Sequence, residues 1–412
     1  MKKILLIITV SLPMMLYAQQ NSQWRGANRD GVYNETGLLK VWPANGPELL
    51  WHFDGLGAGF TSAAIASEKI YITGLTDDKL MLYVLDLKGK LLNKKEVGKE
   101  RDTRYPGTRS SVTVNDGKLY IFNALGNFYC LNETTLNVVW EKNLTTDFDG
   151  KSIMLGLTEN SLIVGDMIFL TPGGVRNNVV ALNKNTGALI WSSPGAGMPS
   201  TYCSPIYIGD QSIPIIVTCF EGIEQGRDNY QNTIAAFNAR TGEMLWSHLI
   251  PSQNDINPNI PIYSDGMIFY TTGYRGGSWL FRLKDGGRAA ELVWKNSEMD
   301  NQMGSAIRIG DYIYGSGHQN NSWFCLDWKT GKTIYKTLEV GRSNIITADG
   351  MLYSYSERGT MYLIKPNPEK FELISSFPVT LGTDQHWAHP VIHRGVLYIR
   401  HGDALMAYKV RK

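Results

Sequence analysis

One short phrase recurs along the chain, and this repetition limits the possible fold more than any other feature. In each copy an alternating strand runs into Asn or Asp, a Thr-Gly turn follows, and a second strand ends in an aromatic residue. Three copies read Ala181-Leu-Asn-Lys-Asn-Thr-Gly-Ala-Leu-Ile-Trp191, Ala236-Phe-Asn-Ala-Arg-Thr-Gly-Glu-Met-Leu-Trp246 and Cys325-Leu-Asp-Trp-Lys-Thr-Gly-Lys-Thr-Ile-Tyr335. A fourth copy, Cys130 to Trp140, has Leu136 in place of the glycine. Repeats of this kind dictate the architecture before any single residue indicates a chemistry.

A second recurrent element precedes each phrase, and it consists of one residue, a short strand, a Gly/Asp turn and another strand. Its eight copies begin at Ser62, Ser111, Asn160, Ser204, Ile260, Ser305, Asn344 and His389. The copies are spaced roughly 40 to 55 residues apart, a typical repeat length for propeller blades. Alternating strands separated by Gly, Asp and Asn turns indicate antiparallel hairpins. The sequence therefore predicts an all-β protein, an eight-bladed β-propeller of four-stranded antiparallel blades.

The two ends of the chain predict how the ring closes. The last unit stops at Lys412 before a closing aromatic strand, while an unpaired strand, Pro47 to Phe53, precedes the first unit. We expect this N-terminal strand to complete the last blade and leave no broken sheet edge. The propeller then spans residues 47–412, and a leader of residues 19–46 is expected to run over the outside of the ring.

The first eighteen residues have the pattern of a secretory signal peptide. Lys2 and Lys3 precede an apolar run from Ile4 to Leu16, and cleavage is expected after Ala18. No cysteine follows the run to carry a lipid anchor, and no later stretch is long enough to span a membrane. We therefore expect a periplasmic or secreted protein, and a monomer.

The charge balance argues against nucleic acid or an anionic membrane surface as a partner. The chain has 40 Lys and Arg and 38 Asp and Glu, so removal of Lys2 and Lys3 would leave 38 basic against 38 acidic side chains. Both of those partners demand a basic excess. The partners that remain are a protein or a carbohydrate.

The four cysteines do not form a disulfide framework. Cys130 and Cys325 occupy the same place in two repeats, where Ala181 and Ala236 stand in two others. Cys203 and Cys219 flank a predicted hairpin, and the sequence leaves both a bridge and two free buried thiols open, with free thiols favoured. No Cys-x-x-Cys-His is present to attach a c-type haem.

In a propeller, the loops that enter the innermost strands gather at one end of the central channel. The residues at and just before those strands predict a mouth with Arg, Glu, His, amide and aromatic side chains, which would suit a small polar or anionic ligand. The candidate ligand-binding residues are Arg109, Glu159, Asn160, Tyr202, Asn259, Arg342, Asn344, Trp387 and His389. The alternative is that these polar residues only solvate a wide shaft, and the sequence leaves both interpretations open.

A metal site is not expected from the histidines of Asp384-Gln-His386-Trp-Ala-His389-Pro-Val-Ile-His393. His389 and His393 share a strand face but lie about 13 Å apart at roughly 3.3 Å per residue. The glycine pairs Gly173-Gly174 and Gly276-Gly277 lack the strand-to-helix context of a phosphate loop. No nucleophile motif is recognisable.

The repeated phrases resemble the tryptophan-docking motif of the pyrroloquinoline-quinone (PQQ) propeller superfamily. Gln23-Trp-Arg-Gly-Ala-Asn-Arg-Asp-Gly31, Tyr105-Pro-Gly-Thr-Arg-Ser110, Thr171-Pro-Gly-Gly174 and Tyr398-Ile-Arg-His-Gly-Asp403 are similar to segments of its exported, single-domain members without assigned activity. The superfamily includes quinoprotein alcohol dehydrogenases and a lipoprotein of the outer-membrane assembly machinery. The resemblance covers essentially the whole mature chain and implies the propeller fold.

Departures from the catalytic branch weaken the transfer of its activity. Quinoprotein dehydrogenases have two adjacent cysteines at the cofactor, and this chain has no Cys-Cys. Glu159-Asn160 is similar to the Glu and Asn that ligate calcium beside the quinone, but neighbours on a strand point to opposite faces. The sequence thus favours a binding or scaffolding module for a protein partner or an envelope glycan, with no cofactor assigned. The alternatives are a PQQ- or sugar-dependent oxidoreductase, with PQQ and Ca²⁺ as cofactors, and a carbohydrate hydrolase or lyase.

Overall fold

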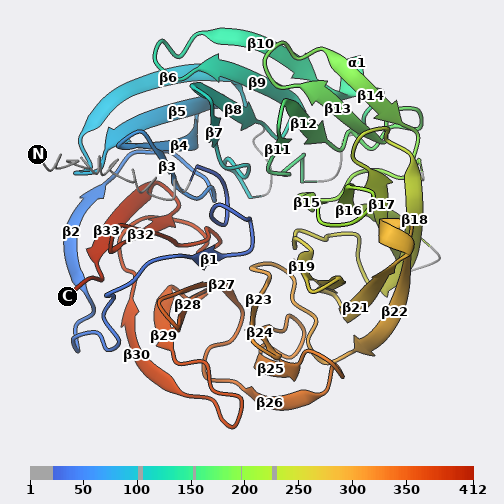
Figure 1. Ribbon diagram of the computed structural model, residues 1–412. Coiled ribbons are helices and arrows are strands. Elements are labelled where there is room, and N and C mark those ends of the chain that lie inside the picture. The colour runs from blue at the N-terminus through green and yellow to red at the C-terminus, as the bar shows by residue number, and fades with distance from the viewer. Residues whose placement is uncertain (1–21, 101–104, 152–154, 196, 225–229) are drawn as a thin grey trace, which may run out of the picture.

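The strands of the chain form a closed ring of blades around a central axis (Figure 1). This computed structural model describes residues 22–100, 105–151, 155–195, 197–224 and 230–412. Within those residues the strands group into eight antiparallel sheets, and this confirms the predicted eight-bladed β-propeller. Helix is confined to a four-residue turn, α1 (Leu144–Asp147), and a 3₁₀ turn, η1 (Asp285–Gly287). The predicted signal peptide, residues 1–18, lies outside the described residues.

Each blade is a meander of four strands, with the first strand innermost and the fourth at the rim. Blade 1 comprises β3 (Ala64–Ala66), β4 (Lys69–Thr76), β5 (Lys79–Asp86) and β6 (Leu91–Lys99), and blade 2 comprises β7 (Thr113–Asn115), β8 (Lys118–Phe122), β9 (Asn127–Asn132) and β10 (Val138–Asn143). Blade 3 comprises β11 (Leu162–Val164), β12 (Met167–Leu170), β13 (Val179–Asn183) and β14 (Leu189–Ser193). Blade 4 comprises β15 (Ile206–Ile208), β16 (Ile215–Glu224), β17 (Tyr230–Asn238) and β18 (Met244–Ser252).

The second half of the ring repeats this order and ends at the C-terminus. Blade 5 comprises β19 (Ile262–Ser264), β20 (Met267–Thr272), β21 (Gly277–Lys284) and β22 (Ala289–Asn296), and blade 6 comprises β23 (Ala306–Ile309), β24 (Tyr312–Ser316), β25 (Trp323–Asp327) and β26 (Thr333–Thr337). Blade 7 comprises β27 (Ser343–Ala348), β28 (Met351–Ser356), β29 (Thr360–Ile364) and β30 (Leu373–Pro378). Blade 8 comprises β31 (Val391–His393), β32 (Val396–His401), β33 (Ala404–Lys409) and, at the rim, β2 (Glu48–Phe53). No helix among the described residues is long and apolar enough to cross a membrane.

Ring closure follows the prediction, because β2 pairs antiparallel with β33 and becomes the rim strand of blade 8. Trp51 on β2 lies opposite Ala407, at the position where blades 2 to 6 place their closing aromatic. Its indole Nε1 donates to the Leu87 carbonyl of blade 1 at 3.0 Å. The first and last strands of the propeller are therefore joined both within blade 8 and across to blade 1.

The recurring phrase joins neighbouring blades by a tryptophan and a glycine. In blade 3, the Trp191 indole Nε1 donates to the Ala239 carbonyl of blade 4 at 3.1 Å. The ring covers Gly242, and a Cβ added to Gly242 would lie 2.5 Å from Trp191 Cε3. Three further pairs repeat this contact across blade boundaries: Trp51 with Gly89, Trp140 with Gly187, and Trp294 with Gly331. Glycine is needed both for its positive φ and for this close approach.

Leu136 is the informative exception to the phrase. It stands where the other copies have glycine, with φ 56° and a 3 % exposed side chain. The preceding blade places Asn93, opposite Val84, at the position of the closing aromatic. Since no indole arrives from blade 1, a leucine side chain fills this boundary instead.

The leader does not stay outside the ring as the sequence analysis expected. Its short strand β1 (Val32–Tyr33) pairs in parallel with the innermost strand β27 of blade 7 (Figure 1). Trp24 reaches His389 of blade 8, while Trp42 packs at the rim against Phe377 with ring centroids 5.2 Å apart. The leader therefore enters the centre of the ring and then leaves toward blades 7 and 8.

Two arginines explain why the leader lies inside. Arg25 is fully buried and donates to the carbonyls of Gly304 and Ile345, at 3.1 and 3.3 Å. Arg29, 4 % exposed, donates to the carbonyls of Asn160 and Ser161 across the ring, at 2.9 and 2.7 Å. Innermost strands have one edge without a sheet partner, and buried carbonyls on that edge need donors.

All four cysteines are buried and free, including Cys203 and Cys219. Burial raises the pKa of the Cys130 and Cys325 thiols to about 11. These side chains therefore act as small apolar groups between strands.

Candidate functional site

A cavity of about 430 Å³ lies at one end of the ring axis. Every blade contributes to it the residue two positions before the residue that opens its innermost strand. These eight residues are Phe60, Arg109, Thr158, Tyr202, Pro258, Met303, Arg342 and Trp387. The repeat thus places one side chain per blade around a single mouth. Four of the eight, Arg109, Tyr202, Arg342 and Trp387, are among the candidate residues named from the sequence.

The leader closes the bottom of this cavity. Trp24 lines it, and its indole Nε1 donates to His389 Nδ1 at 3.3 Å. Burial, and then the charge of Arg25, lowers the pKa of His389 well below its usual value. His389 is therefore neutral, with Nδ1 as a hydrogen-bond acceptor, and it belongs to the floor.

The residues that open the innermost strands of blades 1 to 4 are hydrogen-bonded from each blade to the next. Ser62 N donates to Ser111 Oγ at 2.9 Å, and Ser111 N donates to Asn160 Oδ1 at 2.7 Å. Asn160 N in turn donates to Ser204 Oγ at 2.9 Å. All four are buried. Their polarity is explained by a chain of hydrogen bonds from blade 1 to blade 4.

Seven of the nine predicted site residues line the cavity: Arg109, Asn160, Tyr202, Arg342, Asn344, Trp387 and His389. Asn344 also has a structural role, since its Nδ2 donates to the Trp387 carbonyl at 2.6 Å. The Tyr202 hydroxyl accepts a hydrogen bond from Leu155 N at 3.1 Å. The structure therefore brings seven of the predicted residues together at the mouth, and several of them also hold the wall in place. That they bind a ligand stays a prediction.

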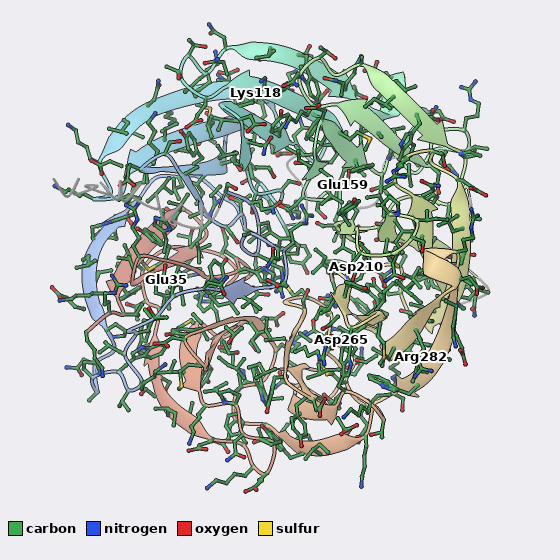
Figure 2. All side chains as sticks on the ribbon, in the orientation of Figure 1. Glu35, Lys118, Glu159, Asp210, Asp265 and Arg282 are labelled. Carbon is green, nitrogen blue, oxygen red and sulfur yellow. The ribbon has the colours of Figure 1, made fainter. Side chains whose placement is uncertain are left out.

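Glu159 and Asn259 are not part of the cavity lining. Glu159 lies on the inner side of the ring (Figure 2), is 2 % exposed, and accepts a hydrogen bond from Thr171 N at 3.0 Å. Burial raises its pKa to about 7. Asn259 is fully buried and donates to the Thr271 and Asn301 carbonyls. Each of the two directly follows a residue that lines the mouth, Thr158 or Pro258. Neighbouring side chains of an extended chain point to opposite sides.

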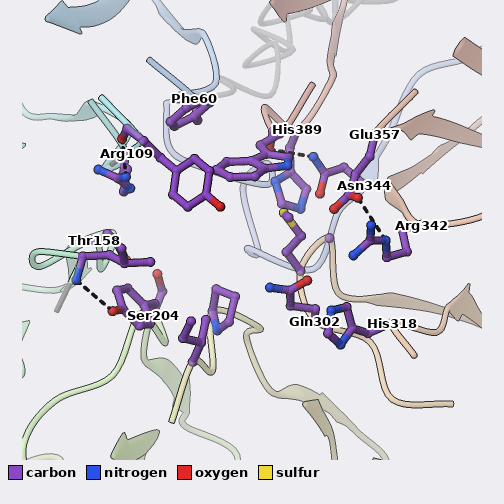
Figure 3. Close-up of a pocket in the computed structure, with 18 of the residues that line it drawn as sticks. Phe60, Arg109, Thr158, Ser204, Gln302, His318, Arg342, Asn344, Glu357 and His389 are labelled. Atoms are coloured by element: carbon purple, nitrogen blue, oxygen red, sulfur yellow. Dashed lines mark hydrogen bonds and ion pairs between the residues drawn. The ribbon is translucent and has the colours of Figure 1, made fainter. Parts of the chain in front are cut away.

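The cavity has an aromatic side. Trp387 contacts Phe60 and Tyr105, with ring centroids 4.9 and 5.2 Å apart. The Arg109 guanidinium lies 5.7 Å from the centre of the Phe60 ring (Figure 3). Arg109 donates to the Tyr105 carbonyl at 2.5 Å and to the Gly107 carbonyl at 3.2 Å, so its loop holds it in place.

The opposite side of the cavity is polar. Arg342 Nε lies 3.0 Å from a Glu357 carboxylate oxygen, and Figure 3 shows this pair facing Arg109 and Phe60 across the cavity. Burial raises the pKa of Glu357, while Arg342 opposes that shift. With Gln302 and His318 beside them, these groups provide donors and acceptors in one wall.

Several of these wall residues were missed by the sequence reasoning. Glu357 follows β28 and His318 follows β24, so neither belongs to the recurring inner element. A buried aspartate, Asp300, positions His318 by accepting a hydrogen bond from its backbone N–H at 2.8 Å. The same carboxylate accepts a hydrogen bond from Arg275 N at 3.0 Å. His318 Nδ1 accepts Tyr274 N at 3.2 Å. Because Nδ1 accepts this hydrogen bond, the His318 ring is neutral and its Nε2 carries the hydrogen. Burial lowers the pKa of His318, in the same direction.

The described residues contain no group of three His, Cys, Asp or Glu side chains arranged to hold a metal ion. His389 and His393 act separately, with His389 in the floor of the cavity and His393 at the end of β31.

The closed ring of eight four-stranded antiparallel blades is that of a PQQ-type β-propeller. A family profile described as PQQ_2, outer membrane protein assembly factor BamB, matches residues 37–296 and, again, residues 161–370. The chain therefore belongs to this family.

The chain is similar to proteins whose names indicate different functions. Quinoprotein alcohol dehydrogenase PedH of Pseudomonas putida is 22 % identical over 294 residues, which cover 63 % of this chain and 47 % of that protein. The solved structure of BamB from Moraxella catarrhalis has a TM-score of 0.62 at 12 % identity, covering 88 % of this chain and 99 % of BamB. A europium-containing methanol dehydrogenase has a TM-score of 0.68 at 13 % identity, covering 94 % and 91 %. The chain spans about half the length of PedH, and these structural likenesses support the fold alone.

Proposed function

We propose that this protein is an exported binding module that takes a ring-shaped ligand bearing an acidic group, such as the end of an acidic envelope glycan, into the channel-mouth cavity. The observation that carries the proposal is the division of that cavity into an aromatic side and a polar side. Trp387 and Phe60 offer faces for a sugar ring. Arg109 beside them offers a cation for a carboxylate.

The size and opening of the cavity agree with such a ligand. Its volume of about 430 Å³ lies in the range of small-molecule sites, roughly 300–1,000 Å³. Asn344, Asp300 and the Tyr105–Gly107 loop hold the wall residues before any ligand arrives. A preformed site loses less conformational entropy on binding.

Thermal-shift titration of the mature protein with glucuronate, with glucose as the neutral control, tests the proposal. A ligand at one hundred times its dissociation constant adds about 2.7 kcal/mol to the stability. We expect glucuronate to raise the melting temperature and glucose to do so less. Arg109→Ala should remove the difference between the two sugars, while Arg282→Ala, a change at an exposed residue of β21, should keep it. Equal shifts for both sugars in the wild type would contradict the role of the cation.

A protein partner is the competing outcome for a binding module. The rim strands expose apolar side chains, among them Leu92 at 47 % and Ile190 at 47 % exposure. If no sugar shifts the melting temperature, while a protein captured from an envelope extract is released by Leu92→Asp and not by Arg109→Ala, the rim rather than the mouth is the binding surface.

A quinone-dependent oxidoreductase is the second candidate, favoured by the likeness to PedH. The cavity fits the organic part of that cofactor, because PQQ is a planar polycarboxylate and would meet Trp387, Arg109 and Arg342. It does not fit the calcium ion, which prefers six to eight oxygen ligands with several carboxylates. Among the described residues that line the cavity, Glu357 is the single carboxylate, and Arg342 engages it.

Adding PQQ with and without Ca²⁺ to the same titration separates the two candidates. We expect any stabilisation by PQQ to be independent of Ca²⁺. A shift that requires both, with alcohol-dependent dye reduction, would replace the binding-module proposal by the oxidoreductase.

A further inference from the structure

The loop that carries Trp387 into the cavity is held by a histidine outside it. This loop, residues 379–390, joins β30 to β31, and His401 at the end of β32 packs against it with 8 % exposure. His401 Nδ1 lies 2.7 Å from the Leu381 carbonyl oxygen. Its Nε2 lies 2.9 Å from the Asp384 carbonyl oxygen. One ring thus contacts two carbonyls of the same loop, three residues apart.

These two contacts determine how many protons His401 carries. A carbonyl oxygen can only accept a hydrogen bond, so each ring nitrogen at such a distance must carry a hydrogen. A neutral imidazole has one N–H, and the imidazolium has two. The geometry is therefore satisfied only by the doubly protonated, positively charged ring.

The neighbouring histidine is in the opposite state. His386 stacks on His401, with ring centroids 3.7 Å apart and 19° between the planes. The Tyr355 hydroxyl on β28 is hydrogen-bonded to His386 Nδ1. Burial, followed by the charge of His401, lowers the pKa of His386 to about 4. A neutral ring thus lies flat against the charged one.

Two charged residues next to His401 in the sequence bond to other groups. The Asp403 carboxylate accepts from Thr383 Oγ1 at 3.0 Å, which ties the same loop to the β32–β33 turn. The Arg400 guanidinium bonds the Thr73 and Gly57 carbonyls of blade 1. Asp384 has an exposed side chain and contributes its backbone carbonyl to His401. The two loop carbonyls are therefore the hydrogen-bond acceptors of the imidazolium.

We propose that His401 is a positioning residue: its doubly protonated ring holds residues 381–387, and with them Trp387, in the arrangement that binds ligand. Loss of the second proton leaves one carbonyl facing a nitrogen lone pair, which releases one end of the loop. Ligand affinity at the mouth then falls as the pH rises. This regulation rests on the proposed function, because it assumes that the mouth binds a ligand.

The position of Trp387 shows how the effect reaches the cavity. Trp387 N donates to the Gln385 carbonyl at 3.1 Å, inside the segment that His401 holds. Its own carbonyl stays bonded to Asn344. Release of Asp384 therefore frees one side of the tryptophan while the other stays anchored, and the aromatic wall loosens without unfolding. The proposal also joins two sequence segments, Asp384 to His393 and Tyr398 to Asp403, that the binding site alone does not explain.

Histidine side-chain NMR on the ¹⁵N-labelled wild-type protein between about pH 5 and pH 8 is the direct test. The chain has seven histidines, so the ring signals can be assigned one by one. We expect both His401 nitrogens to be protonated at the acidic end while His386 stays neutral. Trp387 fluorescence should change in step with His401. An His401 ring with a single proton at pH 5 would overturn the proposal.

The affinity for glucuronate, measured over the same pH range by isothermal titration calorimetry, supplies the functional readout. One charge-assisted hydrogen bond corresponds to a loss of about tenfold in affinity across the His401 transition. His401→Gln should bind weakly and without that transition. His248→Gln, a change on rim strand β18, should keep it. The same pH profile in His401→Gln as in the wild type would refute the role of His401. If glucuronate fails to bind at every pH, the proposed function fails, while the NMR and fluorescence transitions still decide the state of His401 and of its loop.

Discussion

The contact between Trp191 and Gly242 allows the docking of one blade on the next to be tested with a single methyl group. Gly242 has φ +77°, and an added Cβ would lie 2.5 Å from Trp191 Cε3 and 2.9 Å from Cζ3. Gly350 is a matched control, because its φ is +73° and an added Cβ would meet nothing within 4 Å. Gly242→Ala and Gly350→Ala therefore share the backbone cost and differ in the contact with the indole.

The expected magnitudes follow from these two contributions. Alanine in the left-handed region costs roughly 1–2 kcal/mol at either site. Overpacking against a buried ring adds about 1–3 kcal/mol at Gly242 alone. We expect Gly242→Ala to lower the free energy of unfolding by about 2–5 kcal/mol and Gly350→Ala by about 1–2 kcal/mol.

Urea denaturation of both variants, in the wild-type and Trp191→Ala backgrounds, is the assay. Without the indole, Gly242→Ala should cost no more than Gly350→Ala, which gives a coupling energy between residues 191 and 242. Equal costs for the two glycine variants in the wild type, or no coupling, would show that the indole does not lock the blade boundary.

Three other perturbations have outcomes that the structure predicts. Trp191→Ala should lower the free energy of unfolding by about 3–5 kcal/mol. Arg109→Ala should leave the stability, measured as the melting temperature, nearly unchanged. Equal losses of stability in the two variants would mean that the division between docking and mouth residues is wrong. Arg25→Met should lower the free energy of unfolding by about 3–5 kcal/mol, because the substitution removes the buried guanidinium and leaves the Gly304 and Ile345 carbonyls without donors. A loss under about 1 kcal/mol would contradict the buried contacts of the leader. Burial raises the pKa of Glu159 from 4.5 to about 7 in the folded state, so the folded protein binds the extra proton and stability should fall as the pH rises from about 4.5 to 7. Denaturation midpoints across that range should lose this slope in Glu159→Gln, and a slope that persists would place its origin elsewhere.

The sequence could predict the ring because each blade is encoded locally. The alternation of the strands, the Thr-Gly turns and the unpaired strand around Trp51 lie at constant offsets, so their count and closure could be derived without tertiary information. The mouth could be predicted for the same reason, since one residue per blade stands at a fixed distance from the innermost strand. Even the exception at Leu136 is explained by the missing aromatic at Asn93.

The parts that were missed depend on contacts between distant segments. The path of the leader is set by Arg25 and Arg29, whose acceptors lie in blades 3, 6 and 7, and nothing in the leader alone indicates which carbonyls lack donors. Glu357 and His318 come from loops that are not repeated. His401 lies fourteen positions beyond Trp387 and acts through two backbone carbonyls, and a sequence contains no signal for such contacts.

The position of the leader has a consequence for the order in which this chain can fold. Trp24 binds His389, 365 residues later, and β2 needs β33 as its partner. The first segments to leave the ribosome are thus the last to find their partners. Arg25 lacks its carbonyl acceptors until blades 6 and 7 have followed, and β2 lacks its partner until blade 8 has followed. A chain that stops before blade 8 lacks β31 to β33 and His389, so β2 stays unpaired and the floor of the cavity is incomplete.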